Sequence, residues 1–360
     1  MKRRTLILGG GATVATIGAG AAASVVSMGS SDDYARAMAQ LRGPLGSDMR
    51  EIIRYATLAA NGHNTQPWRF KLSAHSIRIA PDFTRRTPIV DPDDHHLYVS
   101  LGCAAENLAL AARARGLIGE PRFENGGVAF DHEPGAQDYS PLFAAIPQRQ
   151  TTRAEFDARA VSSANLAELI SASMTPGVDL ALITERAQLD RVRDLVIASN
   201  SAQMADPAFM AELKQWVRFN PRSALEHGDG LYAAASGNPT LPDWLGPILF
   251  DLAVTAEAEN DKYARQMDSA AGVAVFVAER ADPEHWVAIG RACQRFALRA
   301  TGLGLKLSFV NQPIEVADLR PELASLVGMA NRRPDIVLRF GYGPTLPPSP
   351  RRPVETVLEL

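Results

Sequence analysis

Leu101-Gly-Cys-Ala-Ala-Glu-Asn-Leu-Ala-Leu-Ala-Ala-Arg-Ala-Arg-Gly-Leu117 aligns without a gap with Ile289-Gly-Arg-Ala-Cys-Gln-Arg-Phe-Ala-Leu-Arg-Ala-Thr-Gly-Leu-Gly-Leu305. Apolar residues recur in both segments at the three- and four-residue spacing of a buried helix. Asp-Pro precedes each segment, where the Asp can cap a helix and the Pro can open its first turn. Each segment also runs to a Gly, as helices prefer at their ends. We therefore predict two equivalent helices and an internal duplication, although two unrelated Ala- and Leu-rich helices would share part of this pattern.

The duplication divides the chain into two halves that follow a leader. Its 360 residues exceed one average domain. We assign 1–30 to a leader, 31–145 to a first half and 146–360 to a second half. Residues 206–246, rich in Gly, Pro and aromatic side chains, form an insertion that is either a lid or a plain connection. The repeat helices, 97–116 and 286–303, should pack near each other at a pseudo-twofold axis.

Composition describes an ordinary globular protein and excludes several functions. Charged residues make up 21% and apolar residues 46%, which argues against disorder. A net charge of −3 without a basic stripe argues against nucleic-acid binding. Cys103 and Cys293 are too few for a zinc site or a disulfide framework, and the seven His show no metal-ligand spacing. We expect no metal, even at the acidic stretch before His95-His96, because adjacent side chains on an element point apart.

The N-terminus reads as a targeting segment. Met1-Lys-Arg-Arg4 is basic, and residues 5–28 carry no charge. The start resembles a twin-arginine export signal, which implies a periplasmic or inner-membrane-anchored protein that contacts the membrane only through this segment. Alternatively, Gly9–Gly11 forms the glycine loop of a Rossmann-type nucleotide site with Asp32 or Asp33 as its acid, although residues 25–31 make a poor buried strand.

A polar turn carries the clearest chemical signal. Asn61-Gly-His-Asn-Thr-Gln-Pro-Trp-Arg-Phe70 follows a helix-like run, 49–60, and ends in a strand-like run, 68–72. Gly62 permits close approach of the backbone to a flat ligand, and the amides of Asn61, Asn64 and Gln66 both donate and accept hydrogen bonds. This turn resembles that of the FMN-dependent nitroreductase family, whose members carry an Asn-x-Gln-Pro-Trp core in this setting.

Three further segments match that family in its order along the chain. Arg149-Gln-Thr-Thr-Arg153 resembles its phosphate-gripping Arg-x-Ser/Thr-x-Arg/Lys motif, and two guanidiniums flanking a hydroxyl suit a phosphate. Pro313-Ile-Glu-Val316 resembles its turn over the flavin edge, where backbone N–H groups of Glu315 and Val316 would donate to the flavin. Arg351 and Arg352 match its C-terminal basic pair on the phosphate, although they also suit an exposed tail.

The resemblance, from about residue 49 to the C-terminus, implies an α+β fold in which two fused nitroreductase-like halves form a pseudo-dimer. Each half is expected to hold a mainly antiparallel sheet packed by helices. The closest branch is the fused, Acg-like FMN-binding proteins. Since the first half lacks the arginine motif, we expect one FMN per chain, and since the two halves form an internal pseudo-dimer, we expect a monomer. The residues expected to bind it are Asn61, Gly62, Asn64, Gln66, Arg149, Gln150, Thr151, Arg153, Pro313, Ile314, Glu315, Val316, Arg351 and Arg352, with Arg149, Arg153 and Arg352 converging on the phosphate.

The implied function is two-electron transfer through the flavin, to or from a small nitro or quinone-like substrate. Because the flavin carries the chemistry, no protein nucleophile is required, and His63 is a possible substrate contact. An exported enzyme would lack cytoplasmic NAD(P)H, so the electron donor stays open. Two alternatives remain: a protein that sequesters FMN behind a lid with little turnover, and the Rossmann-type enzyme.

Overall fold

The computed structural model describes residues 28–359, and within this range no helix combines the length and apolarity of a membrane span. The predicted leader lies outside these residues, except for its last three positions. The longer helices are α2 (Ser31–Leu41), α3 (Met49–Thr57), α4 (His95–Ala114), α6 (Ser163–Ser173), α7 (Arg186–Met204), α8 (Pro207–Gln215), α10 (Gly246–Ala253), α11 (Ala256–Asp268) and α12 (Pro283–Gly302). Shorter ones are α5 (Pro141–Ala145), α9 (Pro221–His227), α13 (Gln312–Glu315), α14 (Arg320–Leu326) and α15 (Val354–Val357), with 3-10 turns η1 (Gly62–Asn64), η2 (Phe83–Arg85), η3 (Ala234–Ser236) and η4 (Ala317–Leu319).

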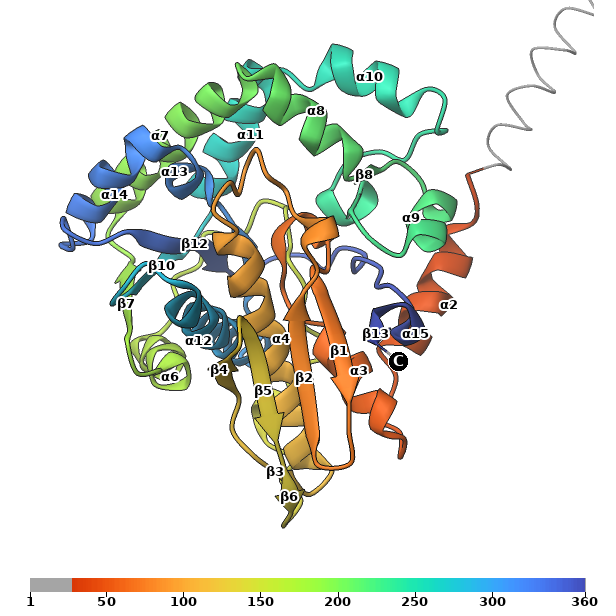
Figure 1. The fold of residues 1–360 in the computed structure, drawn as a ribbon. Helices are drawn as coiled ribbons and strands as arrows, with labels where there is room; N and C mark the ends of the chain where they lie inside the picture. The colour runs from red at the N-terminus through yellow and green to blue at the C-terminus, as the bar shows by residue number, and fades with distance from the viewer. Residues whose placement is uncertain (1–27, 360) are drawn as a thin grey trace, which may run out of the picture.

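Two larger sheets form the frame (Figure 1). The first has the order β13-β1-β2-β5-β4, with β13 (Leu358–Glu359), β1 (Trp68–Leu72), β2 (Ser76–Pro81), β5 (Gly127–Asp131) and β4 (Arg122–Glu124). The second has the order β11-β12-β10-β7, with β11 (Lys306–Phe309), β12 (Pro334–Gly341), β10 (Gly272–Ala278) and β7 (Val178–Ile183). Two small pairs join β3 (Leu117–Ile118) to β6 (Glu133–Pro134) and β8 (Val217–Arg218) to β9 (Leu231–Tyr232). Apart from the parallel β1–β13 and β8–β9 pairs, the named strands pair antiparallel, and the expected α+β class is confirmed.

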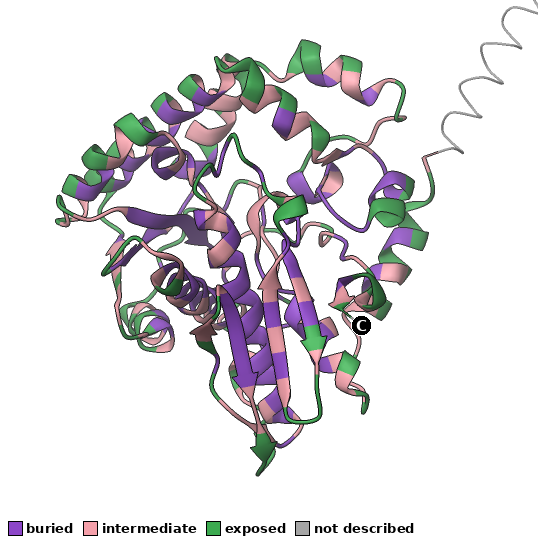
Figure 2. Ribbon diagram, viewed as in Figure 1, coloured by how far each residue is buried: buried purple, intermediate pink, exposed green. Residues whose placement is uncertain are grey.

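The second sheet is covered on both faces, which explains why β10 is a continuous apolar run. Ala274 and Phe276 belong to the core that includes α12, whereas Val273 and Val275 belong to a second core beneath α7 and α13. Successive residues of a strand face opposite sides, so both faces of β10 must be apolar. Figure 2 shows the resulting concentration of buried residues in the central strands and in α4.

The two predicted repeat helices, α4 and α12, pack directly against each other, as expected. Glycines make this contact close, because a Cβ on Gly102 would lie 2.0 Å from the Val287 carbonyl oxygen. Conversely, a Cβ on Gly290 would lie 2.0 Å from the Val99 carbonyl oxygen. The offset of 188 residues that aligns the glycines also aligns the two valines. Such a reciprocal contact is the pattern of two equivalent copies around a twofold axis, and it supports the predicted duplication, which stays a prediction.

The helix ends agree with the sequence in three of four places. Asp282 caps α12, its carboxylate accepting the His285 N–H at 3.0 Å. Gly116 and Gly304 follow α4 and α12 with φ of 71° and 75°, as helix-ending glycines do. The expected cap at Asp91-Pro92 is displaced, because α4 begins at His95. Asp91 still accepts two N–H groups of its first turn, at 2.9 and 3.0 Å.

The C-terminal tail crosses from the second sheet to the first. After β12 the chain continues through residues 342–357 and ends as β13, which pairs with β1 through Phe70 and Leu358. Arg351 lies on this crossing and contacts the polar turn through Asn64. Residues from both parts of the chain therefore meet around the turn.

Candidate functional site

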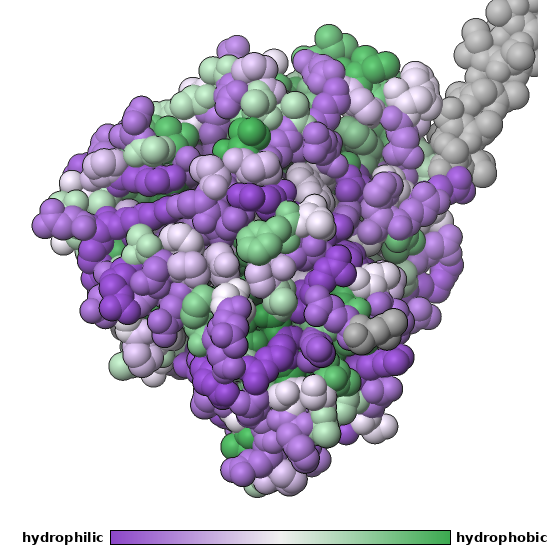
Figure 3. Space-filling model, viewed as in Figure 1, coloured by the Kyte–Doolittle hydropathy of each residue, from purple (hydrophilic) through white to green (hydrophobic). Residues whose placement is uncertain are grey.

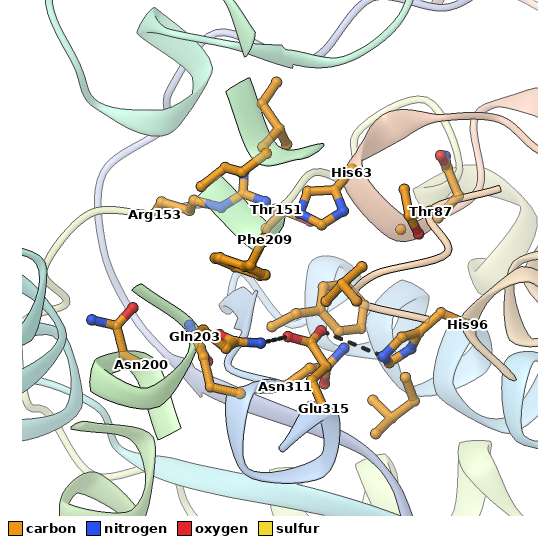
Figure 4. Close-up of a pocket in the computed structure, with 18 of the residues that line it drawn as sticks. His63, Thr87, His96, Thr151, Arg153, Asn200, Gln203, Phe209, Asn311 and Glu315 are labelled. Carbon is orange, nitrogen blue, oxygen red and sulfur yellow. Dashed lines mark hydrogen bonds and ion pairs between the residues drawn. The ribbon is translucent and has the colours of Figure 1, made fainter. Parts of the chain in front are cut away.

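A pocket of about 220 Å³ opens where the polar turn, α4, the 149–153 segment and α13 meet, and we call it the wide pocket. Figure 4 shows His63, Arg153 and Phe209 on one side of it, and Glu315 between Gln203 and His96 on the other. Its lining draws on residues more than two hundred positions apart. Of the predicted residues it includes Asn61, Gly62, His63, Thr151, Arg153 and Glu315.

The polar turn adopts a backbone that side chains seldom tolerate. His63, Asn64 and Gln66 have φ of 46°, 55° and 54°, in the left-handed region. Such conformations cost energy and persist where surrounding contacts hold them. Here the Asn61 Oδ1 accepts the Gln66 N–H at 2.9 Å, which closes the turn. The strained backbone presents His63 to the wide pocket. Burial lowers the pKa of His63 to about 4, although the negative charge of Glu315 acts to raise it.

Gly62 leaves space on the pocket side of the turn. A Cβ placed there would meet only the Cβ of His96, at 3.8 Å, which is ordinary van der Waals contact. The position is therefore open toward the pocket, and a larger side chain would extend into space that a ligand can use.

A second, smaller pocket of about 40 Å³ adjoins the wide pocket, and we call it the arginine pocket. The two pockets share lining residues, including Asn61, Thr151 and Arg153. Four guanidinium side chains line the arginine pocket: Arg42, Arg149, Arg153 and Arg351. The site is thus elongated, with a broad end of mixed polarity and a narrow cationic end.

None of these four arginines forms an ion pair with a carboxylate among residues 28–359. Burial lowers the pKa of each of them, to about 10 for Arg42, and the only groups that oppose the shift are tyrosines and cysteines. Arg149 is 3% exposed, and its Nε and Nη1 have no hydrogen-bond partner among the residues that the structure describes. Buried unpaired charge is expensive, so this arrangement favours an anion between the arginines.

Backbone carbonyls, rather than acids, hold the arginine pocket in shape. The Arg351 guanidinium donates to the carbonyls of Thr57, Leu58 and Ala59 and to the Asn64 Oδ1. The Thr152 N–H donates to the Leu307 carbonyl of β11 at 2.8 Å, which fixes the 149–153 segment against the second sheet. Arg153, in contrast, donates no side-chain hydrogen bond to any described residue and is free to meet a ligand.

An ion pair occupies the floor of the wide pocket. The Glu315 carboxylate lies 3.4 Å from the His96 Nε2 and accepts the Gln203 amide at 2.7 Å. Burial alone would lower the pKa of His96, but the hydrogen bond to Glu315 and the nearby Asp91 charge raise it. Burial alone would raise the pKa of Glu315, but the bonds from His96 and Gln203 lower it. The Glu315 contact therefore favours the protonated form of His96, whereas burial favours the neutral form of His63.

Two of the predicted turn residues have structural roles. Gln66 is fully buried and lines neither pocket; its amide donates to the Gly228 carbonyl at 2.8 Å and accepts the Arg352 N–H at 2.9 Å. It ties the turn to the insertion and the tail. Asn64 borders the arginine pocket, but its amide is used by the carbonyls of Gly230 and Pro350 and by Arg351.

The expectation for 313–316 is corrected. Pro313 and Ile314 are buried in α13 and line neither pocket. The Glu315 N–H donates to the Asn311 carbonyl and the Val316 N–H to the Gln312 carbonyl, both at 3.1 Å. These bonds complete a helical turn, so neither N–H is available to a ligand in this structure. Glu315 reaches the pocket through its carboxylate instead.

The predicted convergence of Arg149, Arg153 and Arg352 is also corrected. Gln150 lines the arginine pocket as expected, beside Arg149, Thr151 and Arg153. Arg352 does not line it, because its guanidinium donates to the Thr356 carbonyl in the tail. Adjacent residues of an extended tail point apart, and here Arg351 faces inward.

Several lining residues carried no recognisable signal in the sequence. Arg42 lies after α2 in no motif, and Gln203 sits on α7, yet both contribute to the site. His96 was visible only as half of a His-His pair, which suggested at most a metal ligand. The ring of the neighbouring His95 lies 4.8 Å from that of His96, and its Nε2 makes a buried contact of 2.9 Å with Asp335.

The insertion contributes to the wide pocket. Phe209 and Leu213 of α8 line it, together with Leu231 of β9. In Figure 1, α7, α8, α10 and α11 lie together along the top of the molecule. The insertion therefore supplies part of the wall of the wide pocket through α8 and β9, and its role as a lid stays a prediction.

Comparison with known proteins places this architecture. The model of the nitroreductase family matches residues 146–343. A Mycobacterium tuberculosis protein with the provisional name NAD(P)H nitroreductase Rv3131 is 25% identical over 88% of this chain and 92% of its own. The provisionally named NAD(P)H nitroreductase acg of the same species is 23% identical over 87% of this chain and 95% of its own. The match to the solved FMN-dependent nitroreductase NfnB of Mycobacterium smegmatis, in complex with NADPH, covers 56% of this chain and 87% of that one, with 15% identity and a TM-score of 0.36.

Proposed function

The chain belongs to the nitroreductase family, and on that premise we propose that it is an FMN-binding oxidoreductase. It would pass two electrons through the flavin to a small quinone-like or nitro acceptor. The Rossmann-type alternative drew on Gly9–Gly11, which lie outside the described residues, and family membership replaces it.

One observation carries the proposal: four arginines meet at one end of the site without a carboxylate. A phosphate supplies the missing anion, and guanidiniums bind its oxygens through charge-assisted hydrogen bonds. The free Nε and Nη1 of Arg149 are donors of the required kind. Thr151 lines both the arginine pocket and the wide pocket. The two pockets are therefore continuous at Thr151, and the chain that links the phosphate of FMN to its ring could pass there.

The wide pocket suits the flavin ring. Gly62 offers room for a flat surface, and Asn61 lines the same wall. Phe209, Leu213 and Tyr263 supply apolar surface from the covering helices. A ring placed there would be bounded by the turn on one side and by α8 on the other.

The bound FMN would supply the two-electron chemistry, and the chain would position it and control its surroundings. Phe209 and Leu213 would shield the ring from water on the α8 side. The strained turn fixes His63 as a neutral donor or acceptor beside the ring site. The Glu315 carboxylate favours a proton on the His96 Nε2, and His96 lines the same pocket, so it could donate a proton to an acceptor that gains electrons.

The electron donor and the location of the protein are also proposals. The names of the two mycobacterial relatives favour NAD(P)H. The twin-arginine-like start favours export, and an exported enzyme would need another donor. Cell fractionation decides the location, and anaerobic bleaching by NADPH decides whether this nucleotide serves.

A second candidate function is sequestration of FMN behind the insertion, with little turnover. The coverage of the pocket by Phe209 and Leu213 favours it. The two functions differ in one respect: a sequestering protein would stay yellow when reductant and then quinone are added, whereas an oxidoreductase would bleach and recolour.

The site assignment is tested at Gly62. A leucine there would fill the space proposed for the ring, so Gly62→Leu should abolish FMN loading while circular dichroism stays unchanged. Gly302→Leu is the matched control, because a Cβ at Gly302 meets no atom within 4 Å and the residue lies outside both pockets. A fully loaded, yellow Gly62→Leu protein would place the flavin elsewhere.

A further inference from the structure

The outer surface of α10 carries an apolar stripe. Trp244, just before the helix, and Ile248 and Leu252 within it are 63%, 52% and 70% exposed. The spacing of four places Ile248 and Leu252 on one side of the helix, and Trp244 lies in the turn that precedes it. Figure 3 shows this hydrophobic surface in green at the top of the molecule, over α10. Large exposed apolar side chains gathered in one place indicate an interaction surface.

The acidic groups beside the stripe already have partners. The Asp251 carboxylate accepts the Lys214 ammonium of α8 at 2.6 Å. The Asp243 carboxylate accepts the Asn220 amide at 2.7 Å. Because these carboxylates are already paired, less free energy is lost when the stripe and its surroundings leave water for an apolar partner. The same contacts join α10 to α8 and the turn before α10 to the start of α9.

An apolar groove of about 460 Å³ runs beside the stripe, between α8 and α10. Met204, Pro207, Met210 and Ala211 line it, with the Lys214–Asp251 pair at its edge. Methionine side chains adapt to irregular apolar partners. The groove thus extends the hydrophobic surface from α10 onto α8.

The chain enters its fold next to this surface. The Met28 carbonyl accepts the Arg222 N–H of α9 at 2.9 Å. Asn220, two residues earlier, holds both Asp243 and the Leu241 carbonyl, immediately before Trp244. Residues 5–28, which precede this point, contain no charged side chain. The point at which the described chain begins, Met28, and the exposed apolar helix therefore lie on the same side of the protein.

We propose that the stripe of Trp244, Ile248 and Leu252, together with the α8–α10 groove, docks on a lipid bilayer. Trp at the end of the stripe suits the headgroup region, where its amphipathic ring is favoured. The aliphatic side chains then enter the acyl boundary, as in amphipathic helices that lie on membranes. The N-terminal segment holds the protein at the bilayer, and the stripe sets its orientation.

Bromolipid quenching of tryptophan fluorescence tests the docking. The full chain is reconstituted with phosphatidylethanolamine and phosphatidylglycerol vesicles, with and without brominated acyl chains, at constant flavin content. Trp68 and Trp286 are buried and Trp216 is half-buried, so bromine in the bilayer should quench chiefly Trp244. We expect quenching in the native chain and its loss in Trp244→Phe, which keeps an apolar ring in the stripe.

Two double variants separate docking from the attachment of the N-terminal segment. Ile248→Ser with Leu252→Ser should lift α10 from the bilayer and remove most of the quenching. Ile170→Ser with Met174→Ser is the matched control, because these apolar residues at α6 are 46% and 72% exposed. It should leave the quenching unchanged.

Unquenched native protein, or equal quenching in Trp244→Phe, would overturn the proposal. Analytical ultracentrifugation tests whether a second copy of the chain, rather than a bilayer, binds to the stripe. A native dimer in solution that the Ile248 and Leu252 changes dissociate would make the stripe a contact between copies, and would also overturn it.

Discussion

Arg153 and Arg351 line the same pocket, yet the protein holds them in different ways. Arg351 is tied to backbone carbonyls on three sides, so it shapes the pocket as well as charging it. Arg153 has no such bonds within the described residues and contributes charge without supporting the fold. A change at Arg153 should therefore affect cofactor binding alone, whereas a change at Arg351 should affect both cofactor binding and stability.

Arg153→Ala should weaken FMN binding by about 1.5–3 kcal/mol, because it removes a charge-assisted hydrogen bond to the phosphate. The midpoint of thermal unfolding of the apoprotein should stay unchanged. Flavin fluorescence titration measures the affinity. Arg265→Ala is the control, since Arg265 is a surface residue paired with Glu155 and should affect binding little. Native affinity in Arg153→Ala would remove this residue from the phosphate site.

Glu315→Gln should lower the pKa of His96, because burial would then act without the opposing carboxylate. In the native protein the pKa of His96 is raised and that of Glu315 is lowered. The pair therefore stabilises the fold between these two values; its contribution is lost as the pH rises through the His96 pKa or falls through the Glu315 pKa.

NMR titration of the histidine ring signals measures this change. Glu259→Gln is the control, because Glu259 also lines the wide pocket but pairs with Lys262. An unaltered His96 pKa in Glu315→Gln would show that the ion pair does not govern this proton.

At the scale of elements, the contact of α4 with α12 joins the two sheets into one core. Gly102 and Gly290 allow the two backbones to touch, and no larger residue fits at either position. The Cys103 thiol donates to the Gly290 carbonyl at 3.2 Å in the same contact. Burial raises the pKa of Cys103 to about 12, so its thiol stays protonated there.

Gly290→Ala should therefore destabilise the protein by at least about 2 kcal/mol, since the helices must separate to admit one methyl group. Chemical denaturation monitored by circular dichroism measures the loss. Gly302→Ala, in the same helix but in open space, should change stability by no more than about 1 kcal/mol. Equal stability of the two variants would contradict the close helix contact.

Helices and strands were predicted correctly from the sequence where a local signal determines them. Strand β1 and both repeat helices were found, because the spacing of apolar residues and the helix-ending glycines are local signals. The Asp91-Pro92 pair predicted that the helix opens at Pro92, but α4 begins three residues later, at His95. The Asp91 carboxylate still accepts N–H groups of the first turn, although Asp91 is not the residue directly before the helix. The N–H groups of Glu315 and Val316 were misassigned, because motif similarity does not reveal that α13 closes a helical turn there.

At the scale of the whole molecule, the site was only partly predictable. The turn and the arginine motif were visible as motifs, and each supplies residues to the pockets. Arg42, Gln203 and Phe209 were not, because their positions depend on how distant segments pack. Which of Arg351 and Arg352 faces inward depends on the path of the tail across the first sheet, and no local pattern sets it.

Absorbance titration of the purified chain with FMN, followed by anaerobic reduction and addition of a quinone, tests the central claim most directly. We expect one FMN per chain, in agreement with a single cationic end in the described site, and a monomer by light scattering. The flavin bands should bleach with reductant and return with quinone. A protein that binds no FMN, or binds it and neither bleaches nor recolours, would contradict the proposed oxidoreductase.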